Sequence, residues 1–318
     1  MSILKMPVFE RLSDRPFAHC AALADLGKAG LAAVWMGGSY ETAPDVGLLE
    51  ARLLPGADGW TPPRVIAQVN GHSLGQPVLL PRPGGDIWFF YVVIQQQDWR
   101  SAVPYVKKSS DGGQTWSEPV RLFDYPGLML RSRPLVLQNR IILPAYDENT
   151  WQSRMIISDD DGQTWRLTAP MISPNGNIHP NLVVMPGGRL LCYLRTGGKG
   201  GVIWRSESSD GGESWSAPEA TALPNPNSGI DLLKLASGRL ALAYNNSPTL
   251  RTPLCVALTT GENEDWRWQQ VIEDEYAEIS YPALLQTADR AIHLVYTYRR
   301  EAIHYARFDE YWLMQGAL

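Results

Sequence analysis

A short motif recurs along the chain at nearly constant spacing. Three segments fit the pattern S-x-D-x-G-x-[ST]-W, at 109–116 (SSDGGQTW), 158–165 (SDDDGQTW) and 208–215 (SSDGGESW), and they begin 49 and 50 residues apart. Weaker copies lie at 259–266 (TTGENEDW) and 53–60 (LLPGADGW). A period of about 50 residues is typical of chains built from repeated supersecondary units. The motif therefore limits the chain to a repeat architecture.

The residue types within the motif predict a tight turn between two strands. The aspartate can accept hydrogen bonds from backbone N–H groups of its own turn, and the glycine supplies a position with positive φ. The tryptophan can cover apolar space between neighbouring sheets. We therefore assign Asp111, Asp160 and Asp210 to folding rather than to catalysis.

A second repeat lies between the copies of the first. Six segments each read as an apolar strand, a tight turn and another apolar strand, at 19–35, 76–93, 133–146, 179–195, 230–245 and 281–299. Continuous apolar runs of this length are typical of strands buried on both faces. The sequence thus predicts an all-β fold, a six-bladed β-propeller with four-stranded blades that forms one domain over residues 1–318. The last blade is one strand short, and we expect residues 3–10 to supply it and close the ring.

The repeated motif is similar to the Asp box of the sialidase (neuraminidase) superfamily. Three further stretches resemble the sialidase-like BNR-repeat group, WMGGSYETAPDV (35–46), LPNPNSGIDLLKLASGRL (223–240) and EISYPALLQ (278–286). The resemblance extends over nearly the whole chain. It implies a sialidase-like six-bladed propeller, Asp boxes on the outer part of the blades, and glycoside hydrolase activity.

Composition and charge exclude several other classes of function. A net charge of −5 without a basic stripe makes nucleic acid and anionic membranes poor partners. The longest apolar run, at 87–94, is too short to cross a bilayer. The start, MSILKMPVFERL, lacks a long apolar segment, so we expect a cytoplasmic protein, or a secreted one if a leader has been removed. The sequence leaves the oligomeric state open.

Cofactor and metal signatures are also missing from the sequence. It contains no Rossmann glycine pattern, and its three cysteines (Cys20, Cys192 and Cys255) lack metal-ligand spacing. We therefore expect no cofactor, no metal among the site residues and three buried free thiols, while the presence of a structural calcium ion in a loop stays open.

A propeller binds ligands at one end of its central channel, where the innermost strands begin. The repeat alignment places His19, Gln76, Arg133, His179, Ile230 and Tyr281 at these starts, and His72 maps to the same face. Five of the six are polar at positions that would otherwise be core, and buried polar groups are costly unless they are paired or used. Four precede a proline, which favours an extended backbone. Together these residues predict a binding site.

The resemblance implies roles for some of these residues. Sialidases hold the substrate carboxylate with three arginines and use a tyrosine nucleophile, a supporting glutamate and an acid on a loop of the first blade. Tyr281 matches the nucleophile, and Asp45 matches the acid, with Glu41 as the rival. Arg195 and Arg251 suit two positions of the arginine cluster.

Two positions depart from the family pattern. The place of the first arginine reads His19-Cys20-Ala21, and a third cation would have to come from Arg131 or Arg133. The supporting glutamate falls in NSGID, where Asp231 is the acid available. The predicted catalytic residues are Tyr281, Asp45, Glu41 and His179. The predicted substrate-binding residues are Arg195, Arg251, Arg131, Arg133, His19, His72, Gln76 and Arg299.

Three functions remain open at this point, all with a carbohydrate as partner. The first is an exo-acting hydrolase of an acidic or otherwise polar glycoside. The second is a polysaccharide lyase, because β-elimination from a uronate needs His, Tyr and Arg side chains, which are supplied by His179, His19, Tyr281 and Arg195. The third is a non-catalytic sugar-binding propeller in which Trp99 and Trp151 stack on sugar rings.

Overall fold

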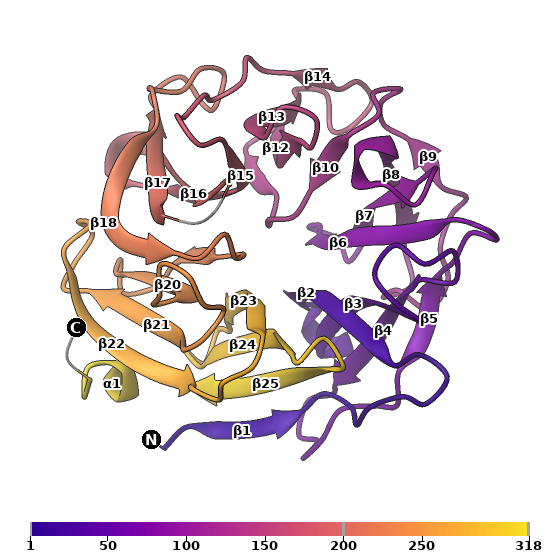
Figure 1. Cartoon of the computed structure of the whole chain (residues 1–318), viewed down its shortest axis with the longest axis horizontal. Coiled ribbons are helices and arrows are strands. Elements are labelled where there is room, and N and C mark those ends of the chain that lie inside the picture. Colours follow the sequence, from indigo (N-terminus) through magenta and orange to yellow (C-terminus); the bar gives the residue numbers. More distant parts are fainter. Residues whose placement is uncertain (1, 199–200, 317–318) are drawn as a thin grey trace.

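The protein is described by a computed structural model that covers residues 2–198 and 201–316. Six antiparallel sheets are arranged around a central axis, so the predicted all-β, six-bladed propeller is confirmed (Figure 1). The helical segments are short: α1 (Glu310–Leu313) and the 3-10 turns η1 (Gly27–Ala29), η2 (Trp99–Ser101) and η3 (Pro186–Gly188). None of the described helices is long and apolar enough to span a membrane.

The blades follow one another in chain order. Blade 1 contains β2 (Phe17–Asp25), β3 (Leu31–Gly38), β4 (Gly47–Leu53) and β5 (Arg64–Ala67), and blade 2 contains β6 (Ser73–Pro81), β7 (Ile87–Ile94), β8 (Ala102–Ser109) and β9 (Val120–Arg121). Blade 3 contains β10 (Leu128–Leu130), β11 (Leu135–Leu137), β12 (Arg140–Asp147), β13 (Gln152–Ser158) and β14 (Arg166–Leu167). Blade 4 contains β15 (Asn177–Val184), β16 (Leu190–Thr196), β17 (Gly201–Ser208) and β18 (Glu219–Asn225). Blade 5 contains β19 (Asp231–Lys234), β20 (Leu240–Asn245), β21 (Leu254–Thr259) and β22 (Trp266–Glu273).

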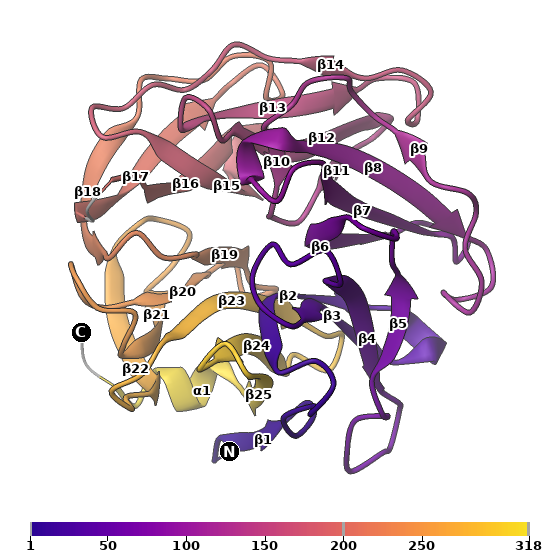
Figure 2. The same cartoon turned by 45° about the vertical axis from the view of Figure 1, so that its right-hand side comes forward.

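Blade 6 combines the two ends of the chain. It contains β23 (Ile279–Gln286), β24 (Ile292–Tyr298), β25 (Ala302–Phe308) and, as its outermost strand, β1 (Leu4–Pro7). Strand β1 runs antiparallel beside β25, with Leu4 opposite Arg307 and Pro7 opposite His304 (Figure 2). The predicted closure of the ring by an N-terminal strand is confirmed, and it covers an edge that would otherwise expose unpaired backbone groups.

Four innermost strands carry the same irregularity near the point where they begin. In β6, Gly75 lies opposite Val92 but Val78 lies opposite Phe90, so one extra residue is inserted. Strands β2, β15 and β23 contain the same one-residue β-bulge. The residues within the bulges have positive φ angles, namely Cys20 (58°), Gln76 (52°), His179 (52°) and Tyr281 (51°). A bulge bends the strand and redirects a side chain.

Two expectations about these strands are wrong. The backbone before proline is not extended at Gln76, His179 and Tyr281, because the bulge places these residues in the left-handed region. In blade 1 the bulge residue is Cys20, so His19 lies one position before it. Blade 3 departs further, since its inner strand is interrupted between β10 and β11 and Arg133 lies in the break.

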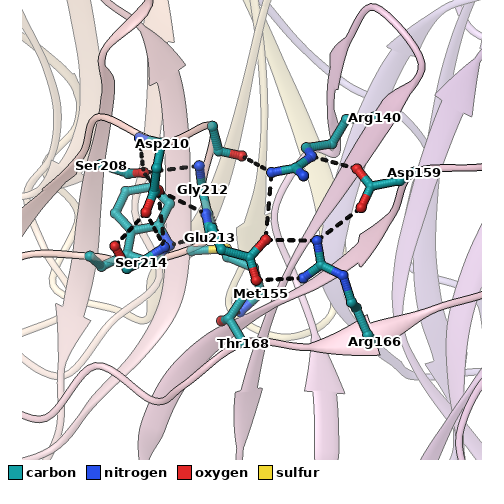
Figure 3. Close-up of polar contacts among 12 residues, drawn as sticks. Arg140, Met155, Asp159, Arg166, Thr168, Ser208, Asp210, Gly212, Glu213 and Ser214 are labelled. Atoms are coloured by element: carbon teal, nitrogen blue, oxygen red, sulfur yellow. Dashed lines mark hydrogen bonds and ion pairs between the residues drawn. The ribbon is translucent and has the colours of Figure 1, made fainter.

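The Asp boxes form the turns between the third and fourth strands of blades 2, 3 and 4. The carboxylate of Asp210 accepts hydrogen bonds from Ser208 Oγ (2.7 Å), Ser214 Oγ, and the backbone N–H groups of Glu213 (3.1 Å) and Ser214 (3.0 Å) (Figure 3). Hydrogen bonds from Ser214 are the main reason why the pKa of Asp210 is lowered to about 2. Asp111 and Asp160 accept the same set of bonds in their own boxes.

The same turns connect neighbouring blades. Glu213, in the box of blade 4, accepts two hydrogen bonds from Arg166 of blade 3, at 2.8 and 2.7 Å (Figure 3). Arg140 of blade 3 donates to the carbonyl oxygen of Gly211 at 3.1 Å. The other copies make similar contacts to the preceding blade: Arg64 with Gly113, Arg82 with Asp161, and Arg205 with Glu264. Each box therefore closes its own turn and joins two blades.

We predict that Asp210→Ala lowers the midpoint of thermal unfolding at pH 7 by a few degrees, because several turn donors lose their acceptor. The folded-state pKa lies below the unfolded value of about 3.9, so this stabilisation is present above that pH and is lost as the pH falls towards about 2. Calorimetry across this range measures the effect. Asp124→Ala, which removes a carboxylate paired with Arg121 at the surface, is the control. An unchanged midpoint at pH 7 would contradict the structural role.

Candidate active site

A cavity of about 150 Å³ lies where the inner strands begin. Its walls come from the inner strands, from the ends of second strands and from the loops between the second and third strands of the blades. The lining residues are Glu41, Gln76, Trp99, Tyr146, Glu148, Trp151, Ile178, Arg195, Arg251, Tyr281 and Arg300. All six blades contribute, and the structure brings the predicted residues Tyr281, Glu41, Gln76, Arg195 and Arg251 together here.

Tyr281 lies in the bulge of β23 and is almost completely buried. Its hydroxyl oxygen accepts a hydrogen bond from Arg195 Nη1 at 2.9 Å. The guanidinium carbons of Arg131, Arg195 and Arg251 lie 5.3, 5.7 and 5.8 Å from the centre of its ring. Burial raises the pKa of Tyr281, so the phenol is protonated at neutral pH, although the neighbouring guanidinium groups favour the phenolate.

Two buried histidines pack against the ring of Tyr281. The ring centres of His19 and His179 lie 4.3 and 5.5 Å from that of Tyr281. His19 Nδ1 is 3.1 Å from Thr297 Oγ1, and His179 Nε2 is 3.3 Å from Tyr146 Oη. Burial lowers the pKa of both histidines well below the usual value, so both are neutral. Neither lines the cavity.

His72, the third predicted histidine, lies elsewhere on blade 2. Its Nδ1 is 3.4 Å from the carbonyl oxygen of Ile94, and it forms an isolated bridge with Val69. It is absent from the cavity lining. The sequence analysis predicted His72 as a substrate-binding residue on the channel face, whereas the structure does not bring it into the cavity.

Three arginines from consecutive blades line the cavity: Arg195 of blade 4, Arg251 of blade 5 and Arg300 of blade 6. Asn227 holds the first two, because its Oδ1 accepts from Arg195 Nε at 2.8 Å and its carbonyl oxygen accepts from Arg251 Nη2 at 3.0 Å. Arg300 donates to Glu41. The third cation of the cavity is therefore Arg300 of blade 6, whereas the sequence suggested Arg131 or Arg133 of blade 3.

The other predicted arginines have different positions. Arg299 pairs with Glu275 and does not line the cavity, so the residue at the site is its neighbour Arg300. Arg131 lies beneath Tyr281 and donates to the carbonyl oxygens of Ala21 (3.0 Å) and Tyr281 (3.2 Å). It connects the inner strands of blades 1, 3 and 6.

Arg133 and Asp231 form a pair deeper in the channel. Arg133 Nη2 lies 3.2 Å from Asp231 Oδ2, and the same oxygen accepts from the backbone N–H of Leu284 at 2.6 Å. Burial raises the pKa of Asp231, although Arg133 opposes this. Both residues border a separate inner cavity together with Ile230. Within the described residues, no carboxylate hydrogen-bonds to the hydroxyl of Tyr281.

Glu278 fixes two of the arginines. Its oxygens accept from Arg251 Nη1 and Arg300 Nε, both at 2.7 Å, and from Ser280 Oγ at 2.9 Å. Burial opposes its ionisation, but the guanidinium groups of Arg251 and Arg300 outweigh burial and lower the pKa of Glu278 to about 2. The glutamate is therefore ionised and holds the arginine cluster in place.

Glu148 has the opposite character. It follows β12 and lines the cavity next to Tyr146. Burial raises the pKa of Glu148 to about 7, although the charge of Arg195 favours the ionised form. The cavity therefore combines a carboxyl group that keeps its proton up to about pH 7 with Glu41, which pairs with Arg300. Carboxyl groups with such different environments are suited to opposite roles in acid–base chemistry.

Asp45 lies outside the cavity. Its carboxylate closes its own turn by accepting from the backbone N–H (3.1 Å) and the hydroxyl (2.6 Å) of Ser39. Despite partial burial, these bonds lower the pKa of Asp45. Of the two blade-1 acids that the sequence suggested, the structure places Glu41 in the cavity.

Two tryptophans form apolar walls. Trp99 packs against Gly75, where a Cβ atom would lie 2.7 Å from its ring, and Trp151 packs against Gly197, where the corresponding distance is 2.9 Å. Larger residues at these glycines would displace the walls.

Glu148, Glu278, Tyr146 and Arg300 were missing from the predicted site, and the signal that could have found them is their position at or next to the ends of second and inner strands. Across the described ranges, no group of three His, Cys, Asp or Glu side chains is placed to hold a metal ion.

A family model described as "BNR repeat-like domain" matches residues 29–294. Among curated proteins, the anhydrosialidase of Macrobdella decora is 24% identical over 198 residues. The match covers 54% of this chain and 26% of that protein, so it extends over about a quarter of the relative's length.

Solved structures share the fold over almost the whole chain. A protein of unknown function from Dyadobacter fermentans superposes with a TM-score of 0.80 at 19% identity, covering 96% of this chain and 98% of the other. The intramolecular trans-sialidase from Ruminococcus gnavus, in complex with oseltamivir carboxylate, superposes with a TM-score of 0.78 at 16% identity, covering 96% and 97%. At these identities the similarity establishes the sialidase-like fold.

We predict that the carboxyl group of Glu148 titrates with a midpoint at about pH 7. NMR spectra of protein with 13C-labelled glutamate, recorded across neutral pH, would show this transition, and Glu148→Gln should remove it. The folded-state pKa exceeds the unfolded value of about 4.3, so the wild type should lose stability relative to Glu148→Gln as the pH rises from about 4.3 to about 7. A midpoint near 4 would contradict the burial argument.

Proposed function

The chain belongs to the BNR repeat-like domain family, and on that basis we propose that it is an exo-acting glycoside hydrolase that removes a terminal sugar bearing a carboxylate. The observation that carries this proposal is the meeting of three arginines, a buried tyrosine and a carboxyl group of raised pKa in one small cavity. Sialic acid is the first candidate sugar, because similar proteins are named as sialidases.

The arginines support an anionic substrate. Guanidinium groups bind carboxylates through paired, charge-assisted hydrogen bonds, and Arg195, Arg251 and Arg300 face one cavity. Their positions are set in advance by Asn227 and Glu278. A cavity of about 150 Å³ has room for one sugar ring, which favours attack on the end of a glycan.

The proposed reaction has two steps. In the first, the oxygen of Tyr281 bonds to the anomeric carbon as the bond to the leaving group breaks, Glu148 gives its proton to the leaving oxygen, and Glu41 accepts the phenol proton. Arg195 stabilises the charge that develops on the tyrosine oxygen. A neutral phenol can approach a sugar that carries a carboxylate more easily than a second anion can.

In the second step, water replaces Tyr281 at the anomeric carbon. Glu148, now ionised, accepts a proton from the water, and Glu41 returns its proton to the tyrosine oxygen. The sum is glycoside plus water giving free sugar plus alcohol, and every residue regains its first state. One position thus serves as acid and then as base, as microscopic reversibility requires.

The lyase and binding alternatives have less support. A lyase base must reach the proton next to the carboxylate, yet His19 and His179 lie behind Tyr281 and do not line the cavity. A binding module has no need of a carboxyl group with a raised pKa among its contact residues, whereas a proton donor does.

We predict that Tyr281→Phe lowers kcat for 3′-sialyllactose by about a thousandfold or more while binding persists. Release of sugar, followed by chromatography and mass spectrometry, measures turnover, and an unchanged thermal midpoint shows that the fold is intact. A product one water lighter than sialic acid would indicate transfer to a hydroxyl of the same sugar. Full activity in this variant would refute the nucleophile assignment.

We also predict that kcat/KM falls as the pH rises through about 7, because Glu148 then loses the proton that the leaving group needs. Glu148→Gln should be nearly inactive on sialyllactose, but it should still release nitrophenol from a nitrophenyl sialoside in a first-turnover burst, because that leaving group needs no proton; later turnovers should be slow, because the second step lacks its base. Glu41→Gln should lose activity on both substrates. The reverse pattern for the two variants would assign the proton donor to Glu41.

A further inference from the structure

A row of buried polar side chains connects Tyr281 with Glu148 along the wall of the cavity. Arg195 Nη1 donates to Tyr281 Oη at 2.9 Å and lies 3.5 Å from His179 Nδ1. The other ring nitrogen of His179, Nε2, is 3.3 Å from Tyr146 Oη. Tyr146 in turn hydrogen-bonds to Glu148, two residues further along the chain. The side chains of His179 and Tyr146 are buried, so solvent water has little access to these bonds.

The bulge of β15 places His179 in this row. His179 has a φ of 52°, and Asn181 Nδ2 donates to its carbonyl oxygen at 2.9 Å. Its ring meets that of Tyr146 edge-on, with the centres 5.1 Å apart and the planes at 61°. In this orientation the ring nitrogens face Tyr146 and Arg195, and His179 does not line the cavity. His179 can therefore act on a substrate only through its neighbours.

The partners of His179 determine which ring nitrogen carries the proton. Burial, and next the charge of Arg195, lower the pKa of His179 well below its usual value, so the ring is neutral and holds one N–H. A guanidinium group can only donate, so Nδ1, which faces Arg195, is the nitrogen without a proton. The proton is therefore on Nε2, and Nε2–H donates to Tyr146 Oη.

The same reasoning gives the direction of the bond between Tyr146 and Glu148. Burial raises the pKa of Tyr146 well above its usual value, so the hydroxyl keeps its proton. Because the Tyr146 oxygen accepts from His179, its O–H must find another acceptor, and a buried hydroxyl without one would be costly. Glu148 supplies that acceptor, and the bond opposes the effect of burial on the carboxyl group. Tyr146 is thus the donor and Glu148 the acceptor.

A protonated carboxyl group has one oxygen that carries the proton and one that accepts. When Tyr146 donates to one oxygen of Glu148, the proton is on the other oxygen. We propose that His179 and Tyr146 are positioning residues that direct the acidic proton of Glu148 towards the leaving group. If Tyr146 were the acceptor instead, that proton would point into the cavity wall. The inference rests on the proposed hydrolase function and specifies how its acid is oriented.

Charged and titratable groups from several elements surround this row. Those around Glu148 are Arg195 of β16, Asp98 and Arg100 at η2, and Asp147 and Tyr146 of β12. Those around His179 are Arg195, Arg131, Arg251, His19, Tyr146 and Tyr281. Among them, the hydroxyl of Tyr146 is neutral, so Tyr146→Phe removes a hydrogen bond to Glu148 without changing the charge of the site.

The first test is the titration of Glu148 in Tyr146→Phe, followed by NMR of 13C-labelled glutamate. Loss of the donor should raise the midpoint above that of the wild type by about half a pH unit, or about threefold in proton affinity. Tyr244→Phe is the matched control, because it removes a buried hydroxyl that donates to Gln269 at 2.6 Å in blade 5. It should leave the midpoint unchanged. An unchanged or lowered midpoint in Tyr146→Phe would overturn the proposal.

The second test reads the proton of His179 directly. In 15N NMR of histidine-labelled protein, His179 should carry its proton on Nε2, and Nδ1 should stay unprotonated from about pH 5 to about pH 9. The signal is identified by its loss in His179→Gln. A proton on Nδ1 would reverse the direction of the bonds and overturn the proposal.

Activity separates orientation of the acid from a general structural effect. Tyr146→Phe should lower kcat for 3′-sialyllactose about tenfold and move the basic limb of kcat/KM to higher pH. The first-turnover burst with a nitrophenyl sialoside should stay nearly unchanged, because that leaving group needs no proton. His179→Gln, whose amide N–H can replace Nε2–H, should keep more activity on sialyllactose than His179→Leu.

The outcomes distinguish this inference from the function on which it rests. An equal loss on both substrates in Tyr146→Phe would reduce Tyr146 to a structural role and overturn the proposal. Absence of turnover of both substrates by the wild type would overturn the hydrolase, while the two NMR measurements would still decide the direction of the hydrogen bonds to Glu148.

Discussion

Neighbouring blades are connected by the Asp-box turns, and hydrogen bonds to one aspartate carboxylate fix the conformation of each turn. In the box of blade 4, Asp210 accepts the hydrogen bonds of its own turn. The side chain of Glu213 in that turn therefore points across the blade boundary and pairs with Arg166. Glu264 and Arg205 repeat the arrangement between blades 4 and 5 without the full motif. Because the outer rim carries these connections, the inner strands need not pack as a purely apolar core, and polar side chains can occupy the axis.

The inner strands place polar side chains at the axis by means of their β-bulges. A non-glycine residue with positive φ is unfavourable and persists where the surrounding structure enforces it. At Tyr281 this enforcement is visible, since Arg131 holds the carbonyl oxygen from below and His19 packs on the ring. The bulge turns a side chain that would otherwise lie in a sheet towards the channel. The contacts that enforce the bulge therefore also fix one orientation of Tyr281, in which its hydroxyl oxygen accepts from Arg195.

The sequence predicts those parts of the protein that are encoded locally or by repetition. The six strand–turn–strand segments predicted the blades and the need for a closing strand, and the proline after Tyr281 marked the inner-strand position. The choice between Arg299 and Arg300 could not be predicted, because adjacent residues of one turn, with φ of 56° and 57°, direct their side chains to different glutamates. The raised pKa of Glu148 could not be predicted either, since it arises from burial by several blades.

In the proposed hydrolase, the charges of the site would couple substrate binding to acid catalysis. Arg251 and Arg300 are already paired with Glu278 and Glu41, whereas the hydrogen-bond partners of Arg195 are neutral groups of Asn227, Tyr281 and His179. A substrate carboxylate would therefore gain most from Arg195. The same guanidinium is the main charge that favours ionisation of Glu148, so its neutralisation by substrate would raise the pKa of Glu148 above about 7. Binding an anionic sugar would then keep the proton on Glu148 at the moment the leaving group needs it, and a neutral sugar would not.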